Sequence, residues 1–223
     1  DLSEVSELHF TGGEPLLDPN NKKILQHLRD IGRLSEVTLT YNTNGTILPD
    51  TELISLWAQT KWVRLHISLD GIGSTFEYTR YPALWDEVEQ NIKQFRNLKG
   101  PCVLLEVNAI VGIHNIFGLP EFFKWWQDNC QTGNQGDPSN IFVREIEPVS
   151  AGGRALQLKY LPSKYREQAI DVLKSIETLP GAMGLATNLS NESSDVWVNY
   201  LNKLDTVRNE DFWNTFPEFK SLL

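Results

Sequence analysis

The chain has 223 residues, of which 40% are apolar and 22% charged, a composition typical of a folded protein large enough to need no disulfide framework. Lys and Arg total 20 against 29 Asp and Glu, a net charge of −9 that argues against nucleic acid as a partner. No apolar run reaches the ~20 residues of a membrane span, and no signal peptide opens the chain. We therefore expect a cytoplasmic protein with no membrane partner.

Strand-like and helix-like segments alternate over the first two thirds of the chain. Strands are predicted at 5–11, 36–41, 62–69, 102–111 and 141–146. The helices between them are predicted at 18–33, 50–57, 84–95 and 119–129. Successive strand ends are 27 to 41 residues apart, a spacing that suits strand–helix units and predicts an α/β fold with a parallel sheet.

The pattern changes after Gly152–Gly153. Residues 161–178 and 194–207 predict amphipathic helices, and 181–193 read as a loose connection between them. The tail from Asp211 is rich in aromatic residues and is expected to dock on the body of the protein. We therefore expect an α/β core over 1–153 and a helical extension over 154–223, with an exposed loop at 131–140.

Three polar, glycine-containing clusters follow successive predicted strands. Gly12 and Gly13 let a ligand approach the backbone closely, and Glu14 can accept hydrogen bonds from an ammonium group. Thr43 and Asn44, after the next strand, suit hydroxyls or a carboxylate. Because ligands bind at the carboxyl ends of parallel strands, these clusters are candidate binding residues.

Ser68 and Asp70 form the third cluster, and Arg80 lies twelve residues beyond Ser68, placed to pair with a carboxylate. Each cluster alone also reads as an ordinary turn. Their order on successive strand ends is what makes the set specific.

The segments HFTGGEPLL, YNTNGT and HISLDG resemble the core of the radical S-adenosylmethionine (radical SAM) superfamily, especially its branch with SPASM or twitch C-terminal extensions. The resemblance covers roughly residues 5 to 150. It implies a partial, TIM-like (β/α)6 barrel without its first strand–helix unit, with S-adenosylmethionine lying across the strand ends.

The resemblance also implies a role for each motif residue. Glu14 and its two glycines would hold the methionine amino group, and Arg80 the carboxylate. Thr43, Asn44 and Ser68 would meet the ribose or the carboxylate, and the strand around Asn108 the adenine. The expected cofactor-binding residues are Gly12, Gly13, Glu14, Thr43, Asn44, Ser68, Asp70, Arg80, Asn108 and Val111.

The chain departs from the family at the iron site. The family uses three cysteines, spaced C-x3-C-x2-C, to hold a 4Fe–4S cluster, whereas Cys102 and Cys130 stand 28 residues apart. We therefore assign no catalytic or metal-binding residue, and expect the cluster ligands of the parent protein to precede Asp1. The edge at 5–11 would then be exposed, which predicts pairing with a second copy.

The resemblance implies a parent enzyme that cleaves S-adenosylmethionine reductively to a 5′-deoxyadenosyl radical. The radical would abstract hydrogen from a peptide, protein or small-molecule substrate, with electrons from a low-potential donor. This chain alone is expected to be inactive. Two alternatives remain open: a degenerate module that binds S-adenosylmethionine or a nucleotide without catalysis, and an unrelated α/β-barrel enzyme with Glu14 and Asp70 as acid and base.

Overall fold

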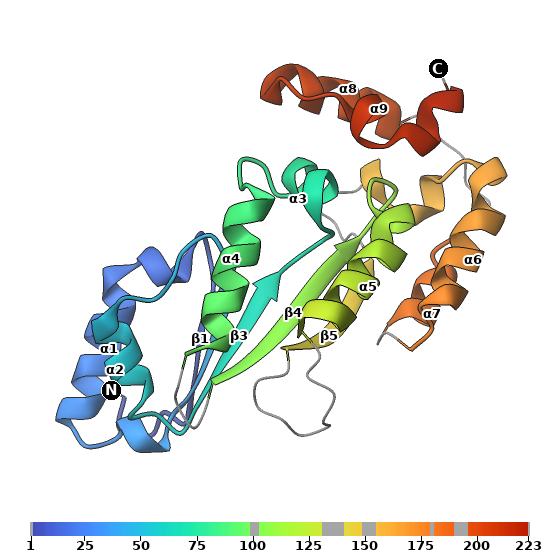
Figure 1. Cartoon of the computed structure of the whole chain (residues 1–223). Helices are drawn as coiled ribbons and strands as arrows, with labels where there is room; N and C mark the ends of the chain where they lie inside the picture. The colour runs from blue at the N-terminus through green and yellow to red at the C-terminus, as the bar shows by residue number, and fades with distance from the viewer. Residues whose placement is uncertain are drawn as a thin grey trace. The chain divides into compact units, whose positions relative to one another are not determined.

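The computed structural model describes residues 2–98, 103–130, 141–148, 155–178, 181–189 and 196–222 (Figure 1). The strands are β1 (Glu7–Phe10), β2 (Thr38–Thr43), β3 (Trp62–Ser68), β4 (Val103–Val111) and β5 (Ile141–Pro148). The first five helices are α1 (Pro19–Asp30), α2 (Thr51–Trp57), α3 (Gly73–Thr79), α4 (Trp85–Arg96) and α5 (Leu119–Cys130). Four more follow: α6 (Arg166–Ser175), α7 (Ala182–Ala186), α8 (Val196–Arg208) and α9 (Phe212–Thr215).

The strands lie in one sheet in the order β1-β2-β3-β4-β5. β1 pairs in parallel with β2, and β2 in parallel with β3, with Asn42 opposite His66. The predicted α/β fold with a parallel sheet is confirmed, and the sheet formed by the described strands is open. β1 lies at its edge, so the pairing of two copies through this strand stays a prediction.

The chain divides into two compact units. The first comprises Asp1–Ser68, Asp86–Val107 and Cys130–Phe142, and the second Leu69–Trp85, Asn108–Asn129 and Val143–Leu223. The predicted boundary at 153/154 and the predicted loop at 131–140 lie outside the described residues, so the proposed two-domain division stays a prediction. Among the described helices, none is long and apolar enough to cross a bilayer.

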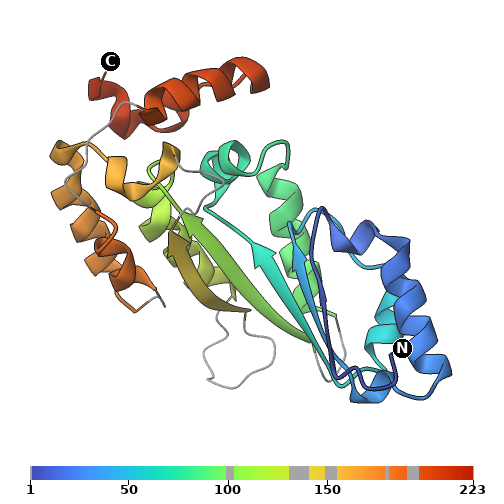
Figure 2. The ribbon, with the colours of Figure 1, turned by 180° about the vertical axis from the view of Figure 1, so that it is seen from behind.

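One face of the first unit's sheet packs against helices. Tyr41 of β2 is fully buried, its ring 5.1 Å from that of Trp57 in α2, and its hydroxyl accepts a hydrogen bond from Trp57 Nε1 at 3.2 Å. α1 begins where the Asp18 carboxylate caps the backbone N–H of Asn20 and Pro19 takes the first position. α1 and α2 lie side by side in both views (Figures 1 and 2).

The opposite face of the same strands is polar. Along β2, Leu39 and Tyr41 are buried, whereas Thr40 and Asn42, which alternate with them, are partly exposed. Arg64 in β3 is exposed. Parallel strands are usually covered on both faces and read as continuous apolar runs. This sheet instead keeps one face for polar side chains.

The second unit is built around an aromatic cluster that includes the C-terminal tail. The side chains of Trp197, Phe212 and Phe219 are all at most 1% exposed. Phe212 lies 5.8 Å from the ring of Tyr78 in α3, and Phe219 lies 5.1 Å from that of Tyr165. The prediction that the tail docks on the body is therefore confirmed.

Three short helices in the described part of the chain, α3, α7 and α9, were not predicted. α7 lies in the segment expected to be a loose connection; it begins after Gly181, whose φ is 86°, and it buries Ala182 and Leu185. α3 has seven residues and starts at Gly73, directly after the turn residues that follow β3. Helices this short show too few residues for the 3.6-residue period to be recognised.

Gly45 gives a direct test of the packing behind the strand ends. Its φ is +77°, and a Cβ there would lie 3.2 Å from both Ile67 Cγ2 and Val88 Cγ1. We predict that Gly45→Ala lowers the free energy of unfolding by about 1–3 kcal/mol, measured by urea denaturation. Gly184→Ala is the control: its Cβ would meet nothing within 4 Å, so it should be neutral or stabilising. Equal effects of the two substitutions would contradict this account.

Candidate functional site

In the first unit, the Glu14 carboxylate ties the ends of β1 and β2 together. Its Oε1 accepts from the backbone N–H of Leu16 at 3.1 Å and from Thr43 Oγ1 at 3.0 Å. Its Oε2 accepts from Thr43 Oγ1 at 2.9 Å and from the backbone N–H of Asn44 at 2.9 Å. Three of the residues predicted for cofactor binding are thus brought into contact. Glu14 remains only half-buried.

Thr43 and Asn44 are both engaged within the chain. Thr43 is 1% exposed, and its Oγ1 also accepts from the backbone N–H of Gly45 at 3.1 Å. Asn44 Oδ1 accepts from the backbone N–H and the hydroxyl of Thr46 at 2.9 and 2.6 Å. The Thr43 hydroxyl is therefore used to orient the Glu14 carboxylate. Asn44, by contrast, is half-buried and has its amide Nδ2 available to a ligand.

Gly12 and Gly13 are exposed, and they are glycines for different reasons. Gly12 has a φ of +124°, a backbone conformation that favours glycine, whereas no such strain exists at Gly13. A Cβ at either position would meet nothing within 4 Å. Nothing within the described chain therefore requires glycine at position 13. A ligand that lay directly against this backbone would require it, because a side chain would then block its approach.

In the second unit, Asp70 follows β3 and is 6% exposed. Its Oδ1 accepts from the backbone N–H of Ile110 in β4 at 2.8 Å, and its Oδ2 lies 2.6 Å from Arg80 Nε. The Arg80 contact is an ion pair without hydrogen-bond alignment, so the buried Nε has no hydrogen-bond acceptor within the described residues. Asp70 and Arg80, both predicted as ligand residues, thus pair with each other.

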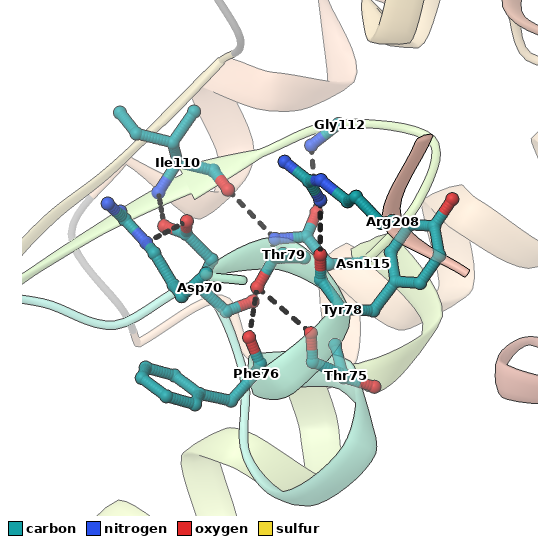
Figure 3. A network of polar contacts seen from close by, with 10 residues as sticks. Asp70, Thr75, Phe76, Tyr78, Thr79, Ile110, Gly112, Asn115 and Arg208 are labelled. Carbon is teal, nitrogen blue, oxygen red and sulfur yellow. Dashed lines mark hydrogen bonds and ion pairs between the residues drawn. The ribbon is translucent and has the colours of Figure 1, made fainter. Parts of the chain in front are cut away.

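Asn115 was missed by the sequence analysis and organises this region (Figure 3). Its side chain is buried, and Nδ2 donates to the backbone carbonyls of Asp70 and Ile110 at 2.7 and 2.8 Å. Its Oδ1 accepts from the backbone N–H of Gly112 at 2.8 Å. One amide therefore joins Asp70, two residues after β3, to the end of β4, and the sequence carries no signal for these long-range contacts.

His114, next to Asn115, is a buried titratable group beside the ion pair. Burial lowers the pKa of His114 to about 4; the Asp70 charge opposes this shift and the Arg80 charge adds to it. The imidazole is therefore neutral near pH 7. Its Nδ1 has no hydrogen-bond partner among the described residues.

The other predicted site residues, Ser68, Asn108 and Val111, differ in whether they have a polar atom without a partner in the described chain. Ser68 is half-buried, and its hydroxyl has no partner within the described chain. Asn108 Oδ1 is buried without a hydrogen-bond donor in the same part of the chain, although the Asn108 carbonyl accepts from the backbone N–H of Leu69 at 3.0 Å. Buried polar atoms are normally paired, so Asn108 Oδ1 is a candidate ligand contact. Val111 is fully buried, and its contact with a ligand stays a prediction.

A second feature missed from sequence is a row of polar side chains across four strands of the first unit. Asn42 Oδ1 lies 3.1 Å from His9 Nε2 and 3.1 Å from His66 Nδ1. His66 Nε2 lies 2.8 Å from Glu106 Oε2. We call His9, Asn42, His66 and Glu106 the polar row. Both histidines fall within strands predicted from the sequence, at 5–11 and 62–69, but the sequence could not show which neighbours they meet.

The described residues do not fit an iron–sulfur cluster. No group of three or more His, Cys, Asp or Glu side chains among them is arranged to hold a metal ion. Cys130 is 1% exposed, and burial raises the pKa of its thiol to about 12, whereas a cluster needs thiolate ligands. Cys102 lies outside the described residues.

Comparison with known proteins gives a family and a set of similar structures. The family profile described as "Radical SAM superfamily" matches residues 2–121. A GTP 3′,8-cyclase from Peptoclostridium acidaminophilum is 27% identical over 195 residues, which cover 81% of this chain and 55% of the relative.

Among solved structures, anSMEcpe with bound AdoMet and Cp18Cys peptide has a TM-score of 0.50 at 16% identity, covering 76% of this chain and 46% of that one. A hexahistidine-tagged form of anSMEcpe with bound AdoMet has a TM-score of 0.50 at 17% identity, covering 76% of this chain and 44% of that one. These similarities show the fold alone. The chain spans about half the length of the proteins it matches. The SPASM or twitch branch stays a prediction.

The buried His114 predicts a specific loss of stability in acid. Its folded-state pKa of about 4 lies below the ordinary 6.5, so the unfolded chain takes up this proton first as the pH falls. The free energy of unfolding should therefore decrease between pH 6.5 and 4, by up to about 3 kcal/mol.

Urea denaturation at pH 7, 5.5 and 4.5 measures this loss, and His114→Asn should remove it. His27→Asn is the matched control because His27 is exposed on α1 and should leave the pH dependence unchanged. A His114→Asn protein with the same acid sensitivity as the unmodified chain would contradict the assignment.

Proposed function

Because the chain belongs to the radical SAM superfamily, we propose that it carries the S-adenosylmethionine-binding part of a radical SAM enzyme. The observation that carries this proposal is the set of strand-end groups that the described chain itself does not use. These are the open backbone at Gly13, the Ser68 hydroxyl and the buried Asn108 Oδ1.

In the first unit, Glu14 would receive the methionine ammonium group. The carboxylate already accepts from two backbone N–H groups and one hydroxyl, which fix its orientation before a ligand arrives. A carboxylate has about four acceptor sites, so one direction remains for the ligand. The backbone of Gly12 and Gly13 would line the approach. Asn44 Nδ2 would donate to a ribose hydroxyl or the carboxylate, and Ser68, at the end of β3, would bind a ribose hydroxyl.

In the second unit, Arg80 would bind the methionine carboxylate. Asp70 sits at Nε and leaves the two terminal nitrogens of the guanidinium, which suit a carboxylate. Asn108 and Val111 would bind the adenine. The assignment of the groups of both units to one ligand rests on the family.

Bound S-adenosylmethionine supplies hydrogen-abstracting radical chemistry in this family when a reduced 4Fe–4S cluster is present. The described residues offer no ligand set for that cluster, so we propose that this chain alone does not cleave S-adenosylmethionine. Anaerobic incubation with S-adenosylmethionine, iron, sulfide and a reductant should then yield no 5′-deoxyadenosine. Its formation would refute this part of the proposal.

We further propose that the polar row faces the substrate. Its side chains offer hydrogen-bond donors and acceptors on the one sheet face that is not covered by apolar packing, which suits a polar substrate. The names of similar proteins supply two classes to test, GTP from the cyclase and a peptide from anSMEcpe. We also propose that the parent enzyme receives its electrons from a low-potential donor.

A binding module without catalysis would use the same groups, and it differs only in whether the parent protein supplies a cluster. The family match removes the alternative of an unrelated α/β enzyme. Glu14 and Asp70 also each accept hydrogen bonds from backbone N–H groups, which gives both carboxylates a structural role.

Calorimetric titration of the chain with S-adenosylmethionine tests the proposal. We predict that Gly13→Ala weakens binding about tenfold or more by placing a methyl group where the ligand approaches, while the thermal midpoint changes little because the site is open. Gly184→Ala, equally open, is the control and should leave binding unchanged. Absence of binding to the folded, unmodified chain would refute the proposal.

A further inference from the structure

Arg80 stands at the end of a helix too short to hold its own position. α3 has seven residues, and the backbone N–H of Arg80 caps it by donating to the Phe76 carbonyl at 2.8 Å. The Thr79 hydroxyl adds contacts to the carbonyls of Thr75 and Phe76 at 2.9 and 3.0 Å (Figure 3). Isolated helices of this length are unstable in water, so the geometry at Arg80 depends on what α3 packs against.

The C-terminal helix α8 contacts the chain on both sides of Arg80. Arg208 Nη1 donates to the Tyr78 carbonyl at 3.0 Å, two residues before Arg80 (Figure 3). The same guanidinium lies 5.2 Å from the centre of the Tyr81 ring, one residue after it. One side chain of α8 therefore brackets the predicted cofactor arginine.

Asp205, one turn earlier on α8, contacts the C-terminal end of α3 through the Tyr78 side chain. Its Oδ1 accepts from the Tyr78 hydroxyl at 2.8 Å, and its Oδ2 accepts from the backbone N–H of Phe212 at 2.9 Å. The Tyr78 ring is 3% exposed and meets Phe216 edge-on at 5.3 Å. Burial raises the pKa of Tyr78, with Asp205 adding to the shift, so the hydroxyl stays a donor.

These contacts join α8 to the one segment that carries the predicted carboxylate-binding group. All the residues concerned belong to the second unit. Arg208 also lies close to Glu210, whose Oε2 is 3.7 Å from Arg208 Nη1. The Arg208 guanidinium, which contacts Tyr78 and Tyr81, is therefore also paired with a carboxylate two residues further along the chain.

We propose that Arg208 and Asp205 are positioning residues for Arg80, through which the C-terminal helices set the affinity of the chain for the carboxylate end of its cofactor. This inference rests on the proposed function, because it takes Arg80 to be the carboxylate-binding group. The C-terminal segment would thereby be a part of cofactor binding although it does not touch the cofactor.

The test compares two ligands that differ at the amino-acid end. S-adenosylmethionine carries the carboxylate, whereas 5′-methylthioadenosine keeps the adenosine and lacks it. We expect Arg208→Gln to weaken S-adenosylmethionine binding about tenfold, within the range of coupling between contacting residues, and to leave 5′-methylthioadenosine binding within about twofold. Lys203→Gln, on the exposed surface of α8, removes the same charge and should affect neither ligand.

Tyr78→Phe provides a second, milder variant that keeps the buried ring and removes only the bond to Asp205. It should shift the affinities in the same selective way. In an Arg80→Gln background, Arg208→Gln should have no further effect on S-adenosylmethionine binding. Equal weakening of both ligands, or additive effects of the two substitutions, would show a general structural role and overturn the inference. Failure of the unmodified chain to bind either ligand would instead refute the proposed function.

Discussion

A strand that ends leaves backbone N–H groups without ladder partners, and here carboxylates accept them. Glu14, after β1, accepts from the N–H of Asn44 after β2, and Asp70, after β3, accepts from the N–H of Ile110 in β4. Buried N–H groups must be paired, so both acids are fixed in place by the fold. The side chains that a ligand would meet are therefore oriented before it binds, which reduces the ordering that binding requires.

The glycines in the turns after the strands differ in whether the packing of the fold requires them. A Cβ at Gly71 would lie 2.6 Å from Thr75 Cγ2, and one at Gly45 would crowd Ile67 and Val88, so packing explains these two glycines. Gly13 has open space and no unusual φ. In the sequence all three look alike, as glycines within a polar turn. Only the packing around them separates a glycine that the fold needs from one that it does not need.

The sequence was sufficient to predict the features that depend on local residue patterns, namely the strands and the turns that follow them. Apolar alternation placed the five strands, and the turns after them marked Glu14, Thr43 and Asn44 as candidate binding residues, although the hydrogen bonds among these three were not predicted. It did not show that Asp70 and Arg80 would pair, nor that Asn115 would join two strand ends, because those contacts depend on residues brought together by folding. Asn115 and Asp70 are 45 positions apart, and Tyr78 and Asp205 are 127 apart. Hydrogen bonds over such separations leave no local pattern in the residues that make them.

The polar face of β2 and β3 has a consequence for how this protein can change over evolutionary time. The buried apolar side chains of these strands, among them Leu39, Tyr41 and Leu65, lie on the opposite face. Replacing Thr40 or Arg64 alters hydrogen bonding on the polar face and removes little buried apolar area. Mutations there can be sampled one at a time without unfolding the chain. A lineage carrying this sheet can therefore vary the side chains of the polar face while its core stays the same.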